Sequence, residues 1–155
     1  MAADSVFTPV VTRLGCVRGI STLRAFGLAT EIGDWHRFTG RSIGAYLGLV
    51  PTEYSSGLTR VQGGFTKTGN SHARRLLIEA VWHHRAPYRP GQDLRRRWEA
   101  ASPAARARGQ AANRRLHARW VSFDERKKRS VVANAAIARG PAGGGRWRSS
   151  TTNTP

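Results

Sequence analysis

The residues best suited to chemistry lie in a stretch rich in glycine and hydroxyl groups between Tyr54 and Asn70. Ser55 and Ser56 stand directly before Gly57, and an activated serine hydroxyl can attack a phosphorus or carbonyl centre as a nucleophile. No Gly-x-Ser-x-Gly sequence surrounds Ser56, and most serines in such loops only cap or solvate the chain. From spacing alone, Ser56 can be interpreted either as a nucleophile or as a solvated loop serine.

The same stretch could bind an anion. Its glycines allow backbone amides to approach a phosphate, and the helix expected from Ser71 adds partial positive charge at its N-terminus. The order of glycine, lysine and hydroxyl differs from that of a P-loop, and a flexible surface turn is an equally good interpretation. The predicted phosphate-binding residues are Arg60, Lys67, Thr68, Asn70, Arg74 and Arg75.

A second candidate phosphate contact precedes this stretch. The spacing of apolar and small residues between Leu14 and Ala25 is typical of a helix-hairpin-helix. In that motif a hairpin glycine brings backbone N–H groups to a DNA phosphate, and the contact does not depend on the DNA sequence. Arg18, Gly19 and Ser21 are its predicted binding residues. Ser21 replaces the usual second glycine, and a plain helical turn is the alternative, but the pattern favours DNA binding. The residues that form it are Leu14, Val17, Gly19, Ile20, Ser21 and Ala25.

No metal site is predicted in this chain. His83 and His84 are adjacent and would point to different faces of a helix, and no cysteine or close carboxylate completes a ligand set. The nine acidic residues are scattered, which argues against a self-sufficient two-metal nuclease. Cys16 is the sole cysteine and is expected to be a small buried residue rather than part of a disulfide.

The charge balance predicts a nucleic-acid partner. Lys and Arg total 26 against nine acidic residues, which gives a formal charge of +17 and a pI near 11.8. Residues 71–129 contain 16 of the basic side chains, so this block is the expected electrostatic footprint. No apolar run is long enough for a membrane span and no signal peptide begins the chain, so we expect no membrane partner and a cytoplasmic, nucleoid-associated location.

The pattern of apolar residues predicts an all-α fold. The expected N-caps are Ser21 and either Asn70 or Ser71, and Gly33 is the expected stop of the second helix. Asp124 is expected to be the N-cap or a first-turn acid of the last helix. In that helix the expected apolar stripe contains Leu23, Phe26 and Ile32 with Ala25 and Ala29. Helices are predicted over residues 6–14, 22–32, 42–49, 71–84, 92–101, 104–123 and 124–138, with an irregular loop over 52–70.

Three regions are expected along the chain. Residues 1–88 would form the domain with the helix-hairpin-helix and the serine loop, and residues 89–139 a basic Ala/Arg-rich helical extension packed through Trp98, Leu116, Trp120 and Val121. The Gly/Ser/Thr-rich residues 140–155 would be a disordered, dispensable tail. The excess of arginine after Arg89 favours phosphate contact over a merely solvated surface.

Several blocks in fixed order resemble the C-terminal domain of the IS110/IS116/IS902 family of insertion-sequence transposases. The resemblance covers roughly residues 14–138. Its most specific parts are Ala-Tyr-Leu-Gly-Leu-Val-Pro at 45–51, the Ser-Gly step at 56–57, and Lys-Thr-Gly-Asn at 67–70 before Arg-Arg-Leu-Leu.

The resemblance implies a DNA transposase in which a serine attacks a phosphodiester. It identifies Ser56 as that serine, with Ser55 as the fallback if the register differs by one. Full-length members carry an N-terminal RuvC-like domain with metal-binding carboxylates, so Mg²⁺ is expected only with that domain and no cofactor in this chain. DNA ends and target DNA are the implied partners, with a guide RNA and a homo-oligomer as further expectations.

Two departures from the family pattern lead us to expect a truncated product that is inactive alone. The RuvC-like domain has no counterpart here, and the helical pattern gives way after Ala138 to Gly/Pro/Ser/Thr sequence. The alternatives are a non-catalytic helix-hairpin-helix module that binds nucleic acid and a ribosomal-type RNA-binding protein. The latter fits the charge but not the ordered motifs.

Overall fold

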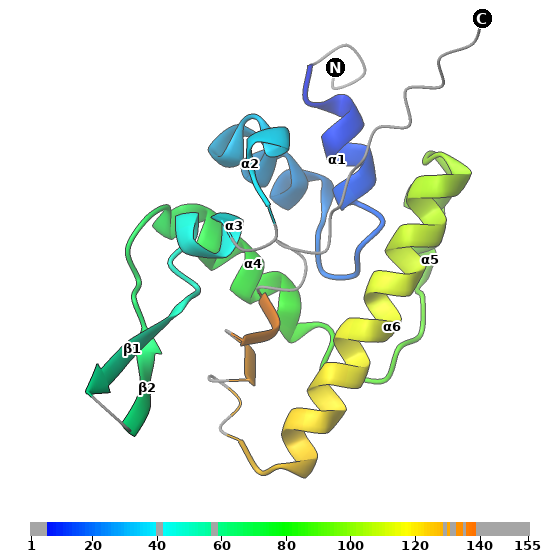
Figure 1. The fold of residues 1–155 in the computed structure, drawn as a ribbon. Helices are drawn as coiled ribbons and strands as arrows, with labels where there is room; N and C mark the ends of the chain where they lie inside the picture. The colour runs from blue at the N-terminus through cyan, green and yellow to red at the C-terminus, as the bar shows by residue number, and fades with distance from the viewer. Residues whose placement is uncertain are drawn as a thin grey trace, which may run out of the picture.

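The computed structural model describes residues 6–39, 42–56, 59–128, 130, 133–134 and 136–138, and of residues 51–63 it describes the backbone alone. The chain is mostly helical, which confirms that part of the predicted fold class (Figure 1). Among these residues no helix is long and apolar enough to cross a membrane. In chain order the elements are α1 (Thr8–Leu14), α2 (Thr22–Ile32), the 3₁₀ helix η1 (Trp35–Arg37), α3 (Ser42–Tyr46), β1 (Pro51–Ser56), β2 (Thr59–Phe65), α4 (Ser71–Trp82), α5 (Gln92–Glu99) and α6 (Pro103–Glu125).

Helix α2 begins and ends where its sequence signals predict. The Ser21 Oγ accepts the backbone N–H of Arg24, which satisfies one of the N–H groups left open at a helix start. Gly33 follows the helix with φ of 66°, a conformation that glycine adopts without a steric penalty. Both predicted boundaries are therefore confirmed.

The predicted apolar stripe of α2 was partly wrong. Leu23 is 84% exposed and Phe26 is 45% exposed, whereas Leu28, which the prediction omitted, is fully buried. The face that packs on α1 and α4 consists of Ala25, Leu28, Ala29 and Ile32. The prediction placed the large apolar side chains Leu23 and Phe26 in the buried face. The buried face instead includes two alanines, because small side chains allow neighbouring helices to approach closely.

A β-hairpin replaces the first part of the predicted irregular loop. Strands β1 and β2 pair antiparallel, from Pro51 opposite Phe65 to Ser56 opposite Thr59, with an irregularity between Pro51 and Glu53. In Figure 1 this two-stranded ribbon projects away from the helices beyond α3 and the start of α4. Its glycines and hydroxyls had masked the strand pattern, because these residues are poor strand formers by propensity.

Helix α6 joins the same hydrophobic core as the first four helices. Leu116 and Trp120 are buried in one cluster with Leu28 and Leu77, and the Trp120 indole N–H donates to the Val81 carbonyl at 3.1 Å. A second cluster joins Leu94 and Trp98 of α5 to Cys16. Of the four packing residues predicted for this region, Trp98, Leu116 and Trp120 are buried, whereas Val121 is 43% exposed.

The end of α6 differs from the prediction. Asp124 lies in the last turn of α6, which ends at Glu125, and does not cap a new helix. The residues described between 130 and 138 are helical, and Ala133, Ile137 and Ala138 are buried in the main core. The predicted tail, residues 140–155, lies outside the described residues.

Candidate nucleic-acid interface

The two candidate nucleophiles lie at the end of a strand. Ser55 and Ser56 are the last residues of β1, and the register pairs them with Arg60 and Thr59 of β2. Directly paired residues of an antiparallel ladder have Cα atoms about 4.5–5.5 Å apart. Ser55 is therefore brought beside the predicted phosphate ligand Arg60, at the end of the hairpin that points away from the helices.

The base of the hairpin is a close crossing of two backbone segments. The connection from α3 to β1 and the connection from β2 to α4 exchange hydrogen bonds: Thr66 N–H donates to Val50, Lys67 to Gly48 and Asn70 to Tyr46. Gly48 and Gly69 have φ of 64° and 86°. A β-carbon on Gly48 would overlap the Thr68 carbonyl, and one on Gly69 would overlap the Tyr46 carbonyl. Only glycine fits at either position.

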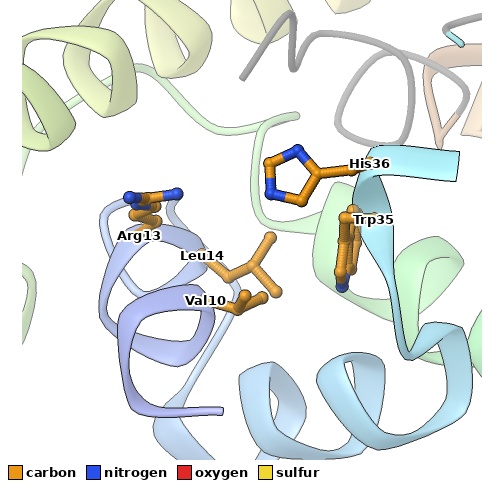
Figure 2. A pocket seen from close by; sticks show the side chains of 5 residues that line it. All are labelled: Val10, Arg13, Leu14, Trp35 and His36. Atoms are coloured by element: carbon orange, nitrogen blue, oxygen red, sulfur yellow. The ribbon is translucent and has the colours of Figure 1, made fainter. Parts of the chain in front are cut away.

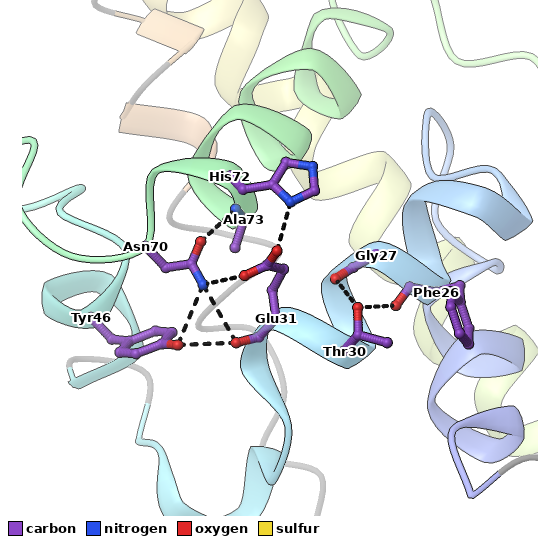
Figure 3. A network of polar contacts seen from close by, with 8 residues as sticks. All are labelled: Phe26, Gly27, Thr30, Glu31, Tyr46, Asn70, His72 and Ala73. Atoms are coloured by element: carbon purple, nitrogen blue, oxygen red, sulfur yellow. Dashed lines mark hydrogen bonds and ion pairs between the residues drawn. The ribbon is translucent and has the colours of Figure 1, made fainter.

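A polar network ties this crossing to α2 (Figure 3). The Asn70 side chain accepts the Ala73 N–H through Oδ1 and donates through Nδ2 to Glu31 Oε2 at 2.7 Å. Tyr46 donates its hydroxyl to the Glu31 carbonyl at 3.0 Å, and His72 Nδ1 lies 2.7 Å from Glu31 Oε1. Hydrogen bonds from His72 and Asn70 lower the pKa of Glu31. The network fixes the start of α4 and, with it, the return of the hairpin.

Arg74, a predicted phosphate ligand, reinforces the same crossing. Its Nη1 donates to the carbonyls of Leu47 and Thr68, at 3.0 and 3.2 Å, one from each connection. Arg75 is exposed and pairs with Glu79 at 2.9 Å, one helical turn away. The structure therefore gives Arg74 a positioning role and leaves Arg75 on the surface.

Lys67 and Thr68 lie on the exposed side of the crossing. Lys67 has φ of 53°, a left-handed conformation that non-glycine residues seldom adopt. Its backbone is held there by the hydrogen bond to Gly48. Of the predicted phosphate ligands, Lys67 is thus a cation whose backbone is fixed beside the hairpin base.

The predicted helix-hairpin-helix forms two helices joined by a turn, and other elements hold that turn. The Arg18 N–H donates to Asn113 Oδ1 at 2.8 Å, and the Arg18 carbonyl accepts from His84 Nε2 at 2.9 Å. The Arg18 guanidinium donates to the carbonyls of Ala86 and Pro87. Gly19 has φ of 84°, and a β-carbon there would overlap the Ala80 carbonyl of α4. Packing on α4 thus accounts for this glycine.

The two predicted groups of ligands lie at opposite ends of α4. Gly19 contacts Ala80 near the end of the helix, whereas Asn70 caps its start. Ten residues at about 1.5 Å rise separate these positions by about 15 Å. The structure therefore brings Lys67, Thr68, Asn70, Arg74 and Arg75 together at the hairpin base, and Arg18, Gly19 and Ser21 into another region. Arg60 lies apart from both groups, near the far end of the hairpin.

The prediction missed the residues that orient the hairpin. Glu31, Tyr46 and His72 come from separate helices, and no periodic or motif signal joins them. Gly48 carried a usable signal, since a glycine after a short helix is a typical stop, but the predicted helix continued to Leu49. Within the described residues no group of three or more His, Cys, Asp or Glu side chains could hold a metal ion.

A small pocket opens between α1 and η1 (Figure 2). Val10 and Leu14 form its apolar side, the Trp35 ring faces them, and Arg13 and His36 lie at its edge. None of the predicted site residues lines it. The pocket suits a small apolar group rather than the charged chemistry predicted for the hairpin.

Comparison with known proteins identifies the family. Residues 11–99 match the model of the transposase IS116/IS110/IS902 family, which is more than half of the chain. The chain belongs to this transposase family. The match includes the hairpin, both glycines of its base and the start of α4.

Curated relatives from several bacteria support this membership. The chain is 42% identical to a putative transposase, y4qE, of Sinorhizobium fredii over 135 residues, which are 86% of the chain and 35% of that relative. It is 39% identical to the transposase for insertion sequence element IS1328 of Yersinia enterocolitica over 52% of the chain and 25% of that relative. The chain thus spans about a third or less of the length of these transposases. No solved structure matches it significantly.

Proposed function

We propose that this chain is the DNA-engaging, serine-bearing part of an insertion-sequence transposase, and that Ser56 is its nucleophile. The observation that carries the proposal is the family match over residues 11–99, which spans Ser56 and the glycine crossing beneath it. Ser55 is the alternative nucleophile, one residue away in β1.

The proposed step is a transesterification at phosphorus. The Ser56 oxygen forms a bond to the phosphorus of a DNA phosphodiester while the bond from phosphorus to a sugar oxygen breaks. The serine loses its proton to a base, and the departing sugar oxygen gains one. The energy of the phosphodiester is conserved in the phosphoserine link, so attack by another sugar hydroxyl can rejoin DNA.

The hairpin base supports binding of the DNA that carries the reacting bond. Lys67 is exposed at that base, which lies about 17 Å from Ser56 at about 3.3 Å per strand residue, so Lys67 can bind a backbone phosphate away from the bond that breaks. The crossing at Gly48 and Gly69, the Arg74 bridge and the Glu31 network hold that base in one arrangement. A preorganised frame of this kind loses little free energy to reorganisation when substrate binds.

The family resemblance carries a further proposal, that Mg²⁺ is held by the carboxylates of a RuvC-like domain. Among the described residues no group of three or more His, Cys, Asp or Glu side chains could hold a metal ion. The turn between α1 and α2 is proposed as a second, sequence-independent phosphate contact. A guide RNA and self-association are proposals carried over from the resemblance.

The test is a chimaera in which this chain replaces the matching 135-residue segment of the Sinorhizobium fredii relative. With a nicked transposon-end duplex, the chimaera should form a covalent protein–DNA adduct that survives denaturing electrophoresis. Ser56→Ala should abolish the adduct and Ser55→Ala should retain it. An adduct that persists in Ser56→Ala refutes the assignment, and DNA binding without any adduct favours the non-catalytic binding module.

A further inference from the structure

Helix α6 presents a long face that is exposed among the residues the structure describes. Its 23 residues extend about 34 Å at 1.5 Å per residue. One side is buried through Ala105, Gly109, Asn113, Leu116 and Trp120. The opposite side is exposed, and the residues along its centre, at spacings of three, four and seven, are Ala104, Ala107, Ala111 and Ala118.

Arginines flank this alanine ridge on both sides. At 100° per residue, Arg114 lies about 50° to one side of the ridge and Arg115 about 50° to the other. Both are exposed. Between Pro103 and Phe123 the helix contains five arginines and no acidic residue, so the face is uniformly cationic.

None of the ion pairs found among the described residues involves Arg114 or Arg115. A row of like charges on a helix is destabilised by mutual repulsion, which an external polyanion relieves. The charge of the face therefore selects a polyanionic partner.

The shape of the face fits the major groove of B-form DNA. That groove is about 12 Å wide and admits an α-helix, whereas the major groove of an RNA duplex is deep and narrow. Alanine side chains allow the helix backbone to approach the groove floor closely. Arginines on the two sides can then reach the phosphates on the two walls.

We propose that the outer face of α6 binds duplex DNA by lying along the major groove, with Arg114 on one phosphate wall and Arg115 on the other. The proposal rests on the proposed function only in taking DNA as the substrate. Figure 1 shows α6 on the opposite side of the molecule from the β1–β2 hairpin. The α6 face would thus hold duplex at a distance from the bond that Ser56 attacks.

The test measures binding of the Ser56→Ala chain to an intact 20-base-pair duplex over a range of salt concentrations. Because the duplex is not cleaved and the serine is absent, the result is independent of the covalent step. Combining Arg114→Gln and Arg115→Gln should lower affinity about tenfold. The slope of log affinity against log salt should fall by about 1.8, or 0.9 for each lost phosphate contact.

A matched variant controls for net charge. Combining Arg37→Gln and Arg85→Gln removes two exposed arginines outside α6 and should leave the slope nearly unchanged. Equal slopes for the two double variants overturn the proposal. Circular dichroism and urea unfolding of both variants establish that α6 stays folded.

A second pair of variants tests the shape of the ridge without changing its charge. Ala111→Leu with Ala118→Leu keeps helix propensity but adds bulk where the helix meets the groove floor, so affinity should fall about tenfold. Unchanged affinity overturns groove insertion. A duplex RNA of the same sequence that binds as tightly as DNA, with the same dependence on Arg114 and Arg115, overturns the choice of DNA.

Discussion

Gly48 lies so close to the carbonyl oxygen of Thr68 that a β-carbon at position 48 would overlap it. The two residues belong to the two connections that enter and leave the β1–β2 hairpin, and Gly69 makes the reciprocal approach to Tyr46. The blocks of sequence that most resemble the transposase family, residues 45–51 and 67–70, are thus the two segments that cross here. The close approach of these two segments requires glycine at positions 48 and 69, and it determines where the strand that bears Ser56 begins.

Replacing either glycine should therefore destabilise the fold more than strain alone explains. Gly33→Ala provides the matched control, because Gly33 also has positive φ but would place its β-carbon in open space. We expect Gly33→Ala to lower the free energy of unfolding by about 1 kcal/mol and Gly48→Ala or Gly69→Ala by about 2–4 kcal/mol. Urea unfolding measures the difference, and equal losses at all three positions would show that the crossing tolerates a methyl group.

The buried His84 makes stability depend on pH. Burial lowers its pKa to about 4, the hydrogen bond from Nε2 to the Arg18 carbonyl acts in the opposite direction, and the Arg18 charge lowers it further. As pH falls below about 6.5 the unfolded chain binds a proton that the folded chain does not. The free energy of unfolding should therefore fall between pH 6.5 and about 4, by roughly 3 kcal/mol, and stay constant above that range.

His84→Gln should remove most of this slope, because glutamine can donate to the Arg18 carbonyl but does not titrate. A smaller slope should remain from His83, whose pKa burial also lowers. The exposed His36 serves as the control, and His36→Gln should keep the full slope. Urea unfolding at several pH values measures how the free energy of unfolding of each variant depends on pH. A His84→Gln variant with the original pH dependence would assign the effect to other groups.

Local signals in the sequence predicted more of this fold than long-range ones did. Ser21, Gly33 and Asn70 were correctly assigned as helix boundaries, because a cap depends on a side chain and a backbone group only a few residues apart. The exposed face of α2 was misassigned, because whether Leu23 or Leu28 is buried depends on where α4 packs. The hairpin was missed for the same reason: its base is held by contacts between segments about 20 residues apart.

In the candidate site, too, the sequence predicted local features but not long-range contacts. The sequence identified the serines, Lys67 and Arg74 by residue type, but it could not assign Arg74 to the carbonyls of Leu47 and Thr68. Gly19 was predicted to approach a phosphate, and its packing against Ala80 gives an internal reason for a glycine there. Gly19→Val would disturb that packing, so it cannot isolate a role in DNA binding.

Lys67 offers a cleaner test of phosphate binding at the hairpin base. Asparagine tolerates the left-handed backbone, so Lys67→Asn removes the charge without adding strain. Loss of this cation should weaken binding of a transposon-end duplex severalfold and lower the slope of log affinity against log salt by about 0.9, with unfolding free energy unchanged within about 0.5 kcal/mol. Lys67→Arg keeps the charge and should keep both the affinity and the slope. An unchanged slope in Lys67→Asn would exclude a phosphate contact by Lys67.

Tandem mass spectrometry of the covalent intermediate tests the assignment of the nucleophile most directly. The chimaera is trapped with a nicked duplex, digested with nuclease and protease, and the peptide that retains a nucleotide remnant is sequenced. We predict that the remnant is attached to the Oγ of Ser56. A remnant on Ser55 or on another residue, or complete cleavage of the DNA with no modified peptide, would contradict Ser56 as the nucleophile.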